Sequence, residues 1–200
     1  ILVTPVLDEG RTFVEGYVPS GEWIDLSTDK RYFSRGTWKY FDAPLNVIPI
    51  SIRCGCIVPM QVSAETTDIA RKKGFSLFVI LSSTDDGSSA AGQRITASGE
   101  LFWDNGDDAN LNYVHVKFEV RDRTLTVTST PSSVESLEKI DYHELDLKLI
   151  FIVGLGKIPS EITLNNNPVK FTYHHNKQTC QLNSQDHITL SKDFIIKWIF

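Results

Sequence analysis

The 200-residue sequence is poor in cysteine and in basic charge, and it has no long apolar run. Lysine and arginine number 20 against 25 aspartates and glutamates, and the resulting net charge of −5 makes nucleic acid a poor candidate partner. The longest apolar runs, such as Phe75–Leu81 and Leu147–Val153, are far shorter than the roughly 20 residues that cross a bilayer. We therefore expect no membrane-spanning segment and interpret these runs as buried strands.

The three cysteines, Cys54, Cys56 and Cys180, are too few for the disulfide framework of a small secreted domain. Cys54 and Cys56 lie one residue apart on a strand-like segment, where a bridge between them would be strained. They could begin a metal site, but no C-x-x-C or H-x-x-x-H pattern follows. Small buried hydrophobic residues are the better interpretation. Whether any of the three pairs with a partner stays open.

The N-terminus lacks both an initiator methionine and the basic segment of a signal peptide. The chain opens inside an apolar run, Ile1–Leu7, and native N-termini seldom begin within a strand. We therefore expect a segment of a longer protein. Its composition, 41% hydrophobic and 10% aromatic, is ordinary for one domain or two small ones.

Strand patterns dominate the chain, and no helical period is sustained; Val134–Glu138 is a weak candidate for a helix. Two hairpins are predicted, Arg11–Val18 with Trp23–Leu26, and Tyr113–Val120 with Thr124–Thr130. Further strands are expected at Trp38–Phe41, Val47–Arg53, Ile57–Met60, Phe75–Leu81, Glu100–Trp103, Leu147–Val153, Ile162–Leu164, Val169–Tyr173, Thr179–Leu182, His187–Leu190 and Phe194–Trp198. The predicted class is all-β, a small antiparallel sheet followed by an antiparallel β-sandwich.

Breaks between the strands suggest the domain organisation. The polar segment Gln61–Gly74 predicts a boundary, with domains at 1–66 and 67–200. Pro49 and Pro59 predict sheet edges or strand ends. Ser82–Ser98 is expected to be a long loop, and Asn165–Pro168 a turn.

Several clusters resemble functional sites but have simpler interpretations. Asp104–Asp108 could hold calcium, yet it lacks the spacing of an EF-hand and better fits a solvated turn. Asp85-Asp86 and Asp107-Asp108 lie in polar loops, where a perturbed carboxyl pKa is not expected. The five histidines, with His174 and His175 adjacent and His115 and His143 unpartnered in sequence, are interpreted as surface or hydrogen-bonded side chains. Exposed aromatics could form a sugar-stacking platform; the candidates are Trp23, Trp38, Tyr40 and Trp103, although Trp is more often core.

Six short patterns follow one another along the first half of the chain. They are Leu2-Val3-Thr4-Pro5-Val6-Leu7, Tyr17-Val18-Pro19-x-Gly21-x-Trp23-x-Asp25, Gly36-x-Trp38, Asp42-Ala43-Pro44-Leu45, Arg53-x-Gly55-x-Ile57-Val58-Pro59 and Gly99-Glu100-Leu101-Phe102-Trp103-Asp104-x-Gly106. Their order resembles the one found after the catalytic barrel of family 31 glycoside hydrolases, and the resemblance covers about the first 120 residues. Within that family, the sequence resembles the animal lysosomal and intestinal α-glucosidases. Cys54 stands where the family usually has Gly or Ala, and Asn105 and Asp107 depart from its usual D-D-G-E.

Trp23-Ile24-Asp25-Leu26 also resembles the family's W-x-D-M segment, which carries the catalytic nucleophile. Its surroundings favour another interpretation, because a nucleophile of that kind ends a parallel barrel strand. Here the tetrapeptide follows a Pro-Ser-Gly turn and matches the pattern that comes after the barrel. We therefore predict no catalytic, cofactor-binding or metal-binding residue in this chain.

The resemblance implies a function for a longer parent protein. The parent would be a retaining α-glucosidase of carbohydrate metabolism that releases terminal α-linked glucose, and its location would be lysosomal, secretory or extracellular. The two β domains would pack beside an upstream (β/α)8 barrel that carries both catalytic aspartates, and α-glucan is a further possible partner. No cofactor is expected. Two alternatives stay open, a non-catalytic carbohydrate-binding module and an adhesion-type sandwich.

Overall fold

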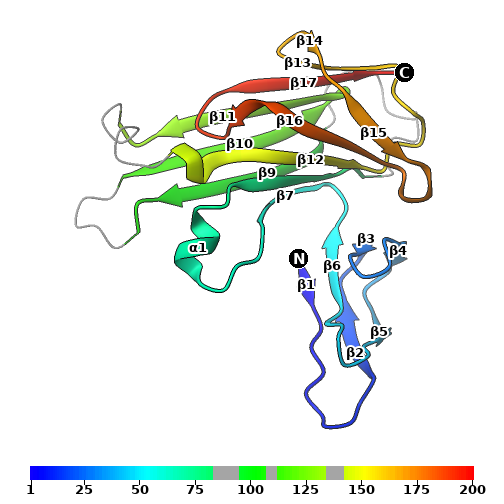
Figure 1. Cartoon of the computed structure of the whole chain (residues 1–200). Coiled ribbons are helices and arrows are strands. Elements are labelled where there is room, and N and C mark those ends of the chain that lie inside the picture. The colour runs from blue at the N-terminus through cyan, green and yellow to red at the C-terminus, as the bar shows by residue number, and fades with distance from the viewer. Residues whose placement is uncertain (83–94, 107–111, 134–141) are drawn as a thin grey trace. The chain divides into compact units, whose positions relative to one another are not determined.

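The computed structural model describes residues 1–82, 95–106, 112–133 and 142–200, with the backbone alone at 95–96, 142–143 and 184–187. Strands make up most of the described chain, so the predicted all-β class is confirmed. The chain divides into two compact units, Ile1–Cys56 and Ile57–Phe200 (Figure 1). The predicted domains, 1–66 and 67–200, stay a prediction, and the compact units meet earlier in the sequence than that boundary.

Two small sheets form the first unit. Its strands are β1 (Leu2–Val3), β2 (Phe13–Val18), β3 (Gly21–Asp25), β4 (Arg31–Ser34), β5 (Thr37–Asp42) and β6 (Ile50–Arg53). Four of them form an antiparallel sheet in the order β1-β6-β3-β4, and β2 and β5 form a separate two-stranded ribbon.

The predicted hairpin of Arg11–Val18 with Trp23–Leu26 is therefore wrong, because β2 pairs with β5 while β3 pairs with β4 and β6. Pro19, Ser20 and Gly21 do redirect the chain, as a turn would. Gly21 has a φ of 137°, which side-chain-bearing residues rarely adopt. This segment carries the chain from one sheet to the other instead of reversing it within a single sheet.

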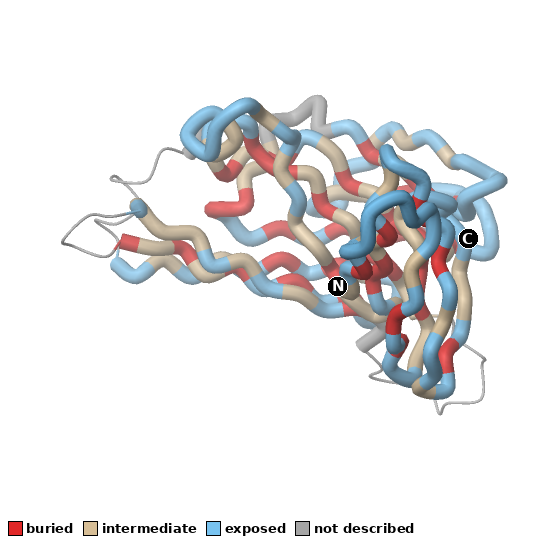
Figure 2. Tube along the Cα trace, turned by 90° about the horizontal axis from the view of Figure 1, so that it is seen from below, coloured by how far each residue is buried: buried red, intermediate tan, exposed pale blue. Residues whose placement is uncertain are grey.

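The core of the first unit is small. Val18, Trp23 and Phe41 form a buried cluster, and partly buried Val14 and Tyr32 pack against it. On the ribbon, the buried and exposed positions alternate, as the period of a strand requires (Figure 2). One face of the ribbon thus faces this core while the other faces outward.

One large sheet dominates the second unit. Its strands are β7 (Cys56–Gln61), β8 (Phe75–Ile80), β9 (Ile95–Asp104), β10 (Tyr113–Arg121), β11 (Thr124–Pro131), β12 (Asp146–Val153), β13 (Glu161–Leu164), β14 (Asn167–Pro168), β15 (Phe171–His174), β16 (Thr179–Thr189) and β17 (Phe194–Ile199). Their order in the sheet is β14-β13-β17-β11-β10-β9-β7-β8-β12-β16-β15. The sheet curls, so that strands from both of its ends contribute to one buried apolar cluster.

Two details of the large sheet differ from the sequence prediction. β8 and β12 are parallel, which is possible because the long chain between them, including β9–β11, supplies the crossover. β7 was expected in the small sheet, with Pro59 at an edge or strand end, yet it lies between β9 and β8.

Turns and short helices connect the strands. Asp122 and Arg123, and likewise Asn165 and Asn166, have positive φ at both central residues, as two-residue hairpin turns require. The predicted hairpin of β10 with β11 and the predicted turn at 165–168 are therefore confirmed.

A short helix, α1 (Thr67–Arg71), occupies the polar segment predicted to hold the domain boundary, and Thr66 Oγ1 caps its start by accepting from Ile69 N–H. Two 3₁₀ turns, η1 (Tyr142–Leu145) and η2 (His175–Lys177), complete the elements. The weak helix candidate Val134–Glu138 and residues 83–94 of the predicted loop lie outside the described residues. The end of that predicted loop, from Ile95, is strand β9. Across the described ranges, no helix is long and apolar enough to cross a membrane.

Candidate functional site

The Trp23–Leu26 segment forms the end of β3 and the turn after it. The buried indole of Trp23 donates a 3.0 Å hydrogen bond from Nε1 to the Pro19 carbonyl. Asp25 Oδ1 accepts three hydrogen bonds, from Ser27 N (2.8 Å), Ser27 Oγ (2.6 Å) and Thr28 N (3.1 Å). The carboxylate thus closes a tight turn, which is a structural role for an aspartate.

The Arg53–Met60 segment links the two units and contains no catalytic arrangement. The Arg53 guanidinium lies 6.0 Å from the Trp23 ring centroid and donates from Nη2 to the Ser20 carbonyl at 3.1 Å. Gly55 has a φ of 86°, so the chain turns between β6 and β7. Cys54 and Cys56 therefore flank a turn and do not share one strand, which corrects the sequence prediction.

Cys54 and Cys180 have the properties of weakly reactive thiols. All three cysteines are free; Cys180 is fully buried, whereas Cys54 and Cys56 are half-buried. Burial raises the pKa of Cys54 from 9.0 to about 11 and that of Cys180 from 9.0 to about 12. Because the thiolate is the form that binds metals and attacks electrophiles, both residues are poorly suited to either task near neutral pH.

A polar cluster surrounds Trp103 at the end of β9. Trp103 Nε1 donates to Glu144 Oε2 at 3.1 Å, and the same oxygen accepts from Arg71 Nε at 3.2 Å. The Arg71 guanidinium lies 4.1 Å from the Trp103 ring centroid and donates to the Asp104 carbonyl. This cluster ties α1, β9 and η1 together, so the Glu100–Asp108 pattern has a structural role here.

The acidic turn after Trp103 is closed by its own hydrogen bonds. Asp104 Oδ1 accepts from Gly106 N at 2.9 Å, and Asn105 Oδ1 accepts from Asn112 N at 3.0 Å. Asp107 and Asp108, like Asp85 and Asp86, lie outside the described residues. In the part of the chain that the structure describes, no three His, Cys, Asp or Glu side chains converge as a metal site requires.

Three of the histidines have described side chains, and each contacts a neighbour on the surface. His115 Nε2 lies 2.7 Å from Glu100 Oε2, and His174 Nε2 lies 3.3 Å from Gln181 Oε1. His175 packs edge-on against Tyr173. These contacts agree with surface or hydrogen-bonded histidines. The side chains of His143 and His187 lie outside the described residues.

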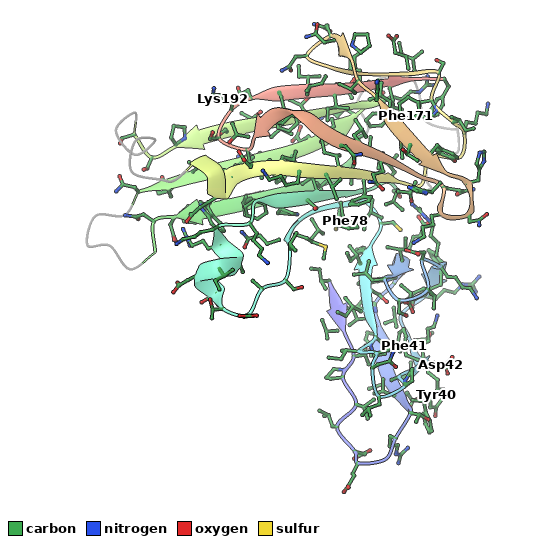
Figure 3. All side chains as sticks on the ribbon, in the orientation of Figure 1. Tyr40, Phe41, Asp42, Phe78, Phe171 and Lys192 are labelled. Carbon is green, nitrogen blue, oxygen red and sulfur yellow. The ribbon has the colours of Figure 1, made fainter. Side chains whose placement is uncertain are left out.

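The four candidate platform aromatics do not lie together. Trp23 is core and Trp103 belongs to the polar cluster, but Trp38 and Tyr40 are exposed neighbours on β5. They share the outward face of the β2–β5 ribbon with Phe13 and Tyr17, and Tyr40 and Asp42 flank buried Phe41 (Figure 3). Phe13 and Tyr17 were not among the predicted platform residues, although their alternation along Arg11–Val18 is a signal that could have identified them.

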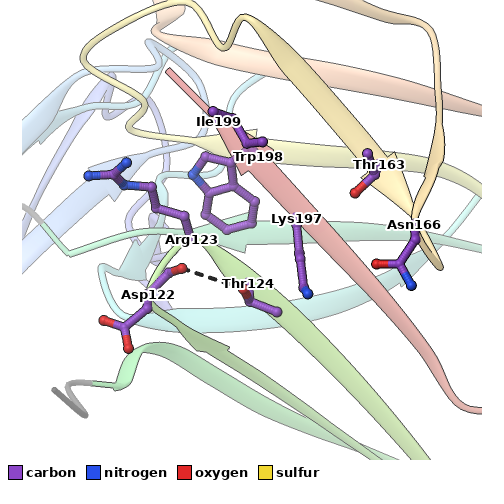
Figure 4. A pocket seen from close by; sticks show the side chains of 8 residues that line it. All are labelled: Asp122, Arg123, Thr124, Thr163, Asn166, Lys197, Trp198 and Ile199. Carbon is purple, nitrogen blue, oxygen red and sulfur yellow. Dashed lines mark hydrogen bonds between the residues drawn. The ribbon is translucent and has the colours of Figure 1, made fainter.

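A shallow cavity of about 410 Å³ lies between two hairpin turns of the second unit. Its lining is Asp122, Arg123, Thr124, Thr163, Asn166, Lys197, Trp198 and Ile199 (Figure 4). A single carboxylate lines it, without the second acidic group that glycoside hydrolysis needs and without a nucleophile beside a base. The cavity therefore has no arrangement for catalysis.

Comparison with known proteins matches this chain to one family of glycoside hydrolases. Residues 1–58 match the glycosyl hydrolase family 31 C-terminal domain. The chain is 28% identical to lysosomal alpha-glucosidase of Bos taurus, over 99% of this chain and 21% of that protein. It is 32% identical to the same enzyme of Rattus norvegicus, over 86% of this chain and 19% of the relative. The chain thus spans about a fifth of the length of these relatives.

The fold is also found in a solved structure. The crystal structure of the Glc1Man2-bound glucosidase II alpha subunit aligns with this chain with a TM-score of 0.71 at 19% sequence identity. The alignment covers 98% of this chain and 22% of the subunit. Both units of the chain are thus included in the fold similarity.

Proposed function

Because this chain belongs to the C-terminal region of the family 31 glycoside hydrolases, we propose that it is an accessory region of a retaining α-glucosidase. The parent would hydrolyse terminal α-linked glucose, and its catalytic (β/α)8 barrel would lie outside this chain. The role of the region is structural, to cover apolar surface of the barrel and complete the fold. No catalytic, cofactor or metal residue is assigned to it.

The observation that carries this proposal is the match to only about a fifth of each α-glucosidase, in a family region described as C-terminal. The carboxylates support it. Retaining glycosidases need two carboxyl groups about 5–5.5 Å apart, one of them with a raised pKa. Among the described residues, no aspartate or glutamate is buried. Asp25, the carboxylate in the most suggestive sequence, closes a turn.

An uncovered aliphatic edge supports a role beside another domain. Ile1, Val3 and Leu7 are exposed along and after β1, which is the outermost strand of its sheet. Leu45 and Ile48 are exposed on the segment before β6, and this segment is joined to β1 where Thr4 N–H donates to the Pro49 carbonyl at 3.0 Å. Clustered exposed apolar side chains mark surfaces that another domain or protein covers. They also argue against the adhesion-type alternative, for which a self-standing monomer without such a surface is expected.

Hydrolysis assays test the proposal directly. The purified 200-residue chain is expected to release no aryl alcohol from an aryl α-glucoside above the buffer rate, while an intact α-glucosidase serves as the positive control. Hydrolysis by the chain that survives repeated purification would refute the accessory role. The covering role is tested by Leu7→Ser with Leu45→Ser, which should reduce self-association of the chain in sedimentation velocity.

The carbohydrate-binding alternative is favoured by one observation, the exposed aromatic face of the β2–β5 ribbon. This function would operate alongside the structural one, since the ribbon and the aliphatic edge use different residues.

A further inference from the structure

The β2–β5 ribbon has an outward face made of aromatic rings and carboxylates. Phe13, Tyr17, Trp38 and Tyr40 are between 44% and 66% exposed, although aromatic side chains of this size are usually buried. The strand register places Tyr17 opposite Trp38 and Glu15 opposite Tyr40. The rings meet edge to face in two pairs, Tyr17 with Trp38 at 6.0 Å and Phe13 with Tyr40 at 6.1 Å between centroids.

We propose that this face, defined by Phe13, Tyr17, Trp38 and Tyr40, binds neutral α-glucan chains. The glucan specificity rests on the α-glucosidase function proposed for the parent; the aromatic face itself does not depend on that function. Sugar rings present flat patches of C–H groups that pack on aromatic faces, and their hydroxyls need hydrogen-bond partners at the rim. Successive cross-strand rows on the ribbon are about 7 Å apart, so successive sugar units can contact successive rows.

The charge on the face selects a neutral, hydroxyl-bearing ligand. Its two charged side chains, Glu15 and Asp42, alternate with the aromatic rings, and no lysine or arginine occupies an outward position of β2 or β5. Within the described ranges, neither carboxylate forms a hydrogen bond or an ion pair, so both can accept from sugar hydroxyls. Arg11, at the end of the ribbon, lies 5.5 Å from the Phe13 ring centroid, and its charge is balanced by Asp8 at 3.5 Å. Anionic polymers would be repelled by such a face.

Other exposed aromatics are less suited to this ligand. Phe102 and Tyr113 stack on each other at 4.7 Å, so each ring already has one face covered. Phe33, 68% exposed on β4, forms no aromatic pair among the described residues. The ribbon combines several exposed rings with free acceptors, and Phe33 and Phe102 therefore provide matched controls.

Affinity electrophoresis of the 200-residue chain tests the proposal. Native gels containing soluble starch or glycogen should retard the chain, whereas gels containing dextran sulfate should not. Trp38→Ala with Tyr40→Ala should abolish the retardation. Calorimetry with maltoheptaose should show binding weakened about tenfold or more by Trp38→Ala alone, the effect of removing a stacking ring from an aromatic platform. Phe33→Ala and Phe102→Ala should bind as the unchanged chain does.

The proposal is overturned if starch and glycogen do not retard the unchanged chain, or if the Trp38→Ala/Tyr40→Ala chain is retarded equally. If the face is instead an interface between protein surfaces, glucan has no effect on mobility, and the double variant changes the sedimentation coefficient. Circular dichroism spectra of the variants must match that of the unchanged chain, which shows that they are folded. Glu15→Gln keeps all four aromatic rings, so it should weaken glucan binding less than Trp38→Ala does.

Failure here can be told apart from failure of the accessory role. Glucan binding without hydrolysis supports both proposals, and hydrolysis by the chain refutes the accessory role alone. Absence of both binding and hydrolysis refutes the aromatic platform and leaves the accessory role in place.

Discussion

The two compact units differ in how they bury apolar surface. The first unit has a buried cluster of Val18, Trp23 and Phe41, and it leaves both an aliphatic edge and an aromatic face exposed. The second unit has one continuous cluster, to which strands from β7 to β17 contribute. Small domains bury a lower fraction of their surface and are marginally stable. The second unit therefore has the larger core, and we expect a single core substitution there to have the larger effect on stability.

The largest expected effect is the loss of stability when a buried phenylalanine is truncated, and comparing this loss in the two units tests the difference in core size. Phe118 is fully buried on β10, and Phe118→Ala should lower the free energy of unfolding of the second unit by about 3–5 kcal/mol. Phe41→Ala should cost the first unit about 3 kcal/mol or less, since its smaller core can relax around the cavity. Urea unfolding followed by tryptophan fluorescence measures both, because each unit contains two of the four tryptophans.

Phe33→Ala serves as the control for this comparison, because Phe33 is exposed and forms no aromatic pair among the described residues, so its loss should change stability by no more than about 0.5 kcal/mol. A single shared transition, shifted equally by Phe118→Ala and Phe41→Ala, would contradict the view that the units have separate cores.

An intermediate effect should come from the cluster around Trp103. Arg71→Met removes the guanidinium that pairs with Glu144 at 3.2 Å and covers the Trp103 ring. The side chains of Arg71 and Glu144 are 31% and 14% exposed, so the cost should be about 1–3 kcal/mol and below that of a fully buried pair. Chemical denaturation of the second unit measures this cost.

The matched control is Arg121→Met, which breaks the exposed Arg121–Glu119 pair at a similar distance, 3.3 Å. Surface pairs contribute little, so this variant should stay within about 0.5 kcal/mol of the unchanged chain. Equal losses for the two arginine variants would mean that burial around Trp103 adds nothing.

Local sequence patterns predicted most strands and both hairpin turns of the second unit. Alternation identified β10 and β11, and asparagine at 165 and 166 supplied residues that tolerate positive φ. Pairing partners in the first unit could not be predicted in this way. Whether β2 pairs with β3 or with β5 depends on contacts between residues far apart in sequence, and the turn at Gly21 is compatible with both arrangements.

Exposure was equally hard to predict for the candidate site. Trp23, Trp38 and Trp103 have similar strand contexts in the sequence, yet they are core, exposed and part of a polar cluster respectively. Arg71 and Glu144 determine the surroundings of Trp103 but are distant from it in sequence. Arg71 also lies in the polar segment that was predicted to be a domain boundary. Side-chain type alone therefore indicates which residues can bind a sugar, and the fold decides which of them are accessible.

The smallest effect concerns one thiol in each unit, half-buried Cys54 and buried Cys180. Cys54 in the first unit has its pKa raised from 9.0 to about 11 by burial, and Cys180 in the second has its pKa raised to about 12. Each folded unit retains a thiol proton that the unfolded chain releases near pH 9, so this contribution to stability is present below pH 9. It is lost as the pH rises through about 11 in the first unit and about 12 in the second.

Alkylation rates at pH 8 should report the same difference. A pKa raised from 9 to about 11 reduces the reactive thiolate of Cys54 about 100-fold relative to the unfolded chain. Cys180, fully buried in the larger core, should react still more slowly, because it becomes accessible only when the second unit opens. Mass spectrometry after iodoacetamide treatment, with Cys54→Ser and Cys180→Ser chains to assign the adducts, measures both rates. Faster labelling of Cys180 than of Cys54 would show that the second unit opens more readily, and the inferred order of stability would then be reversed.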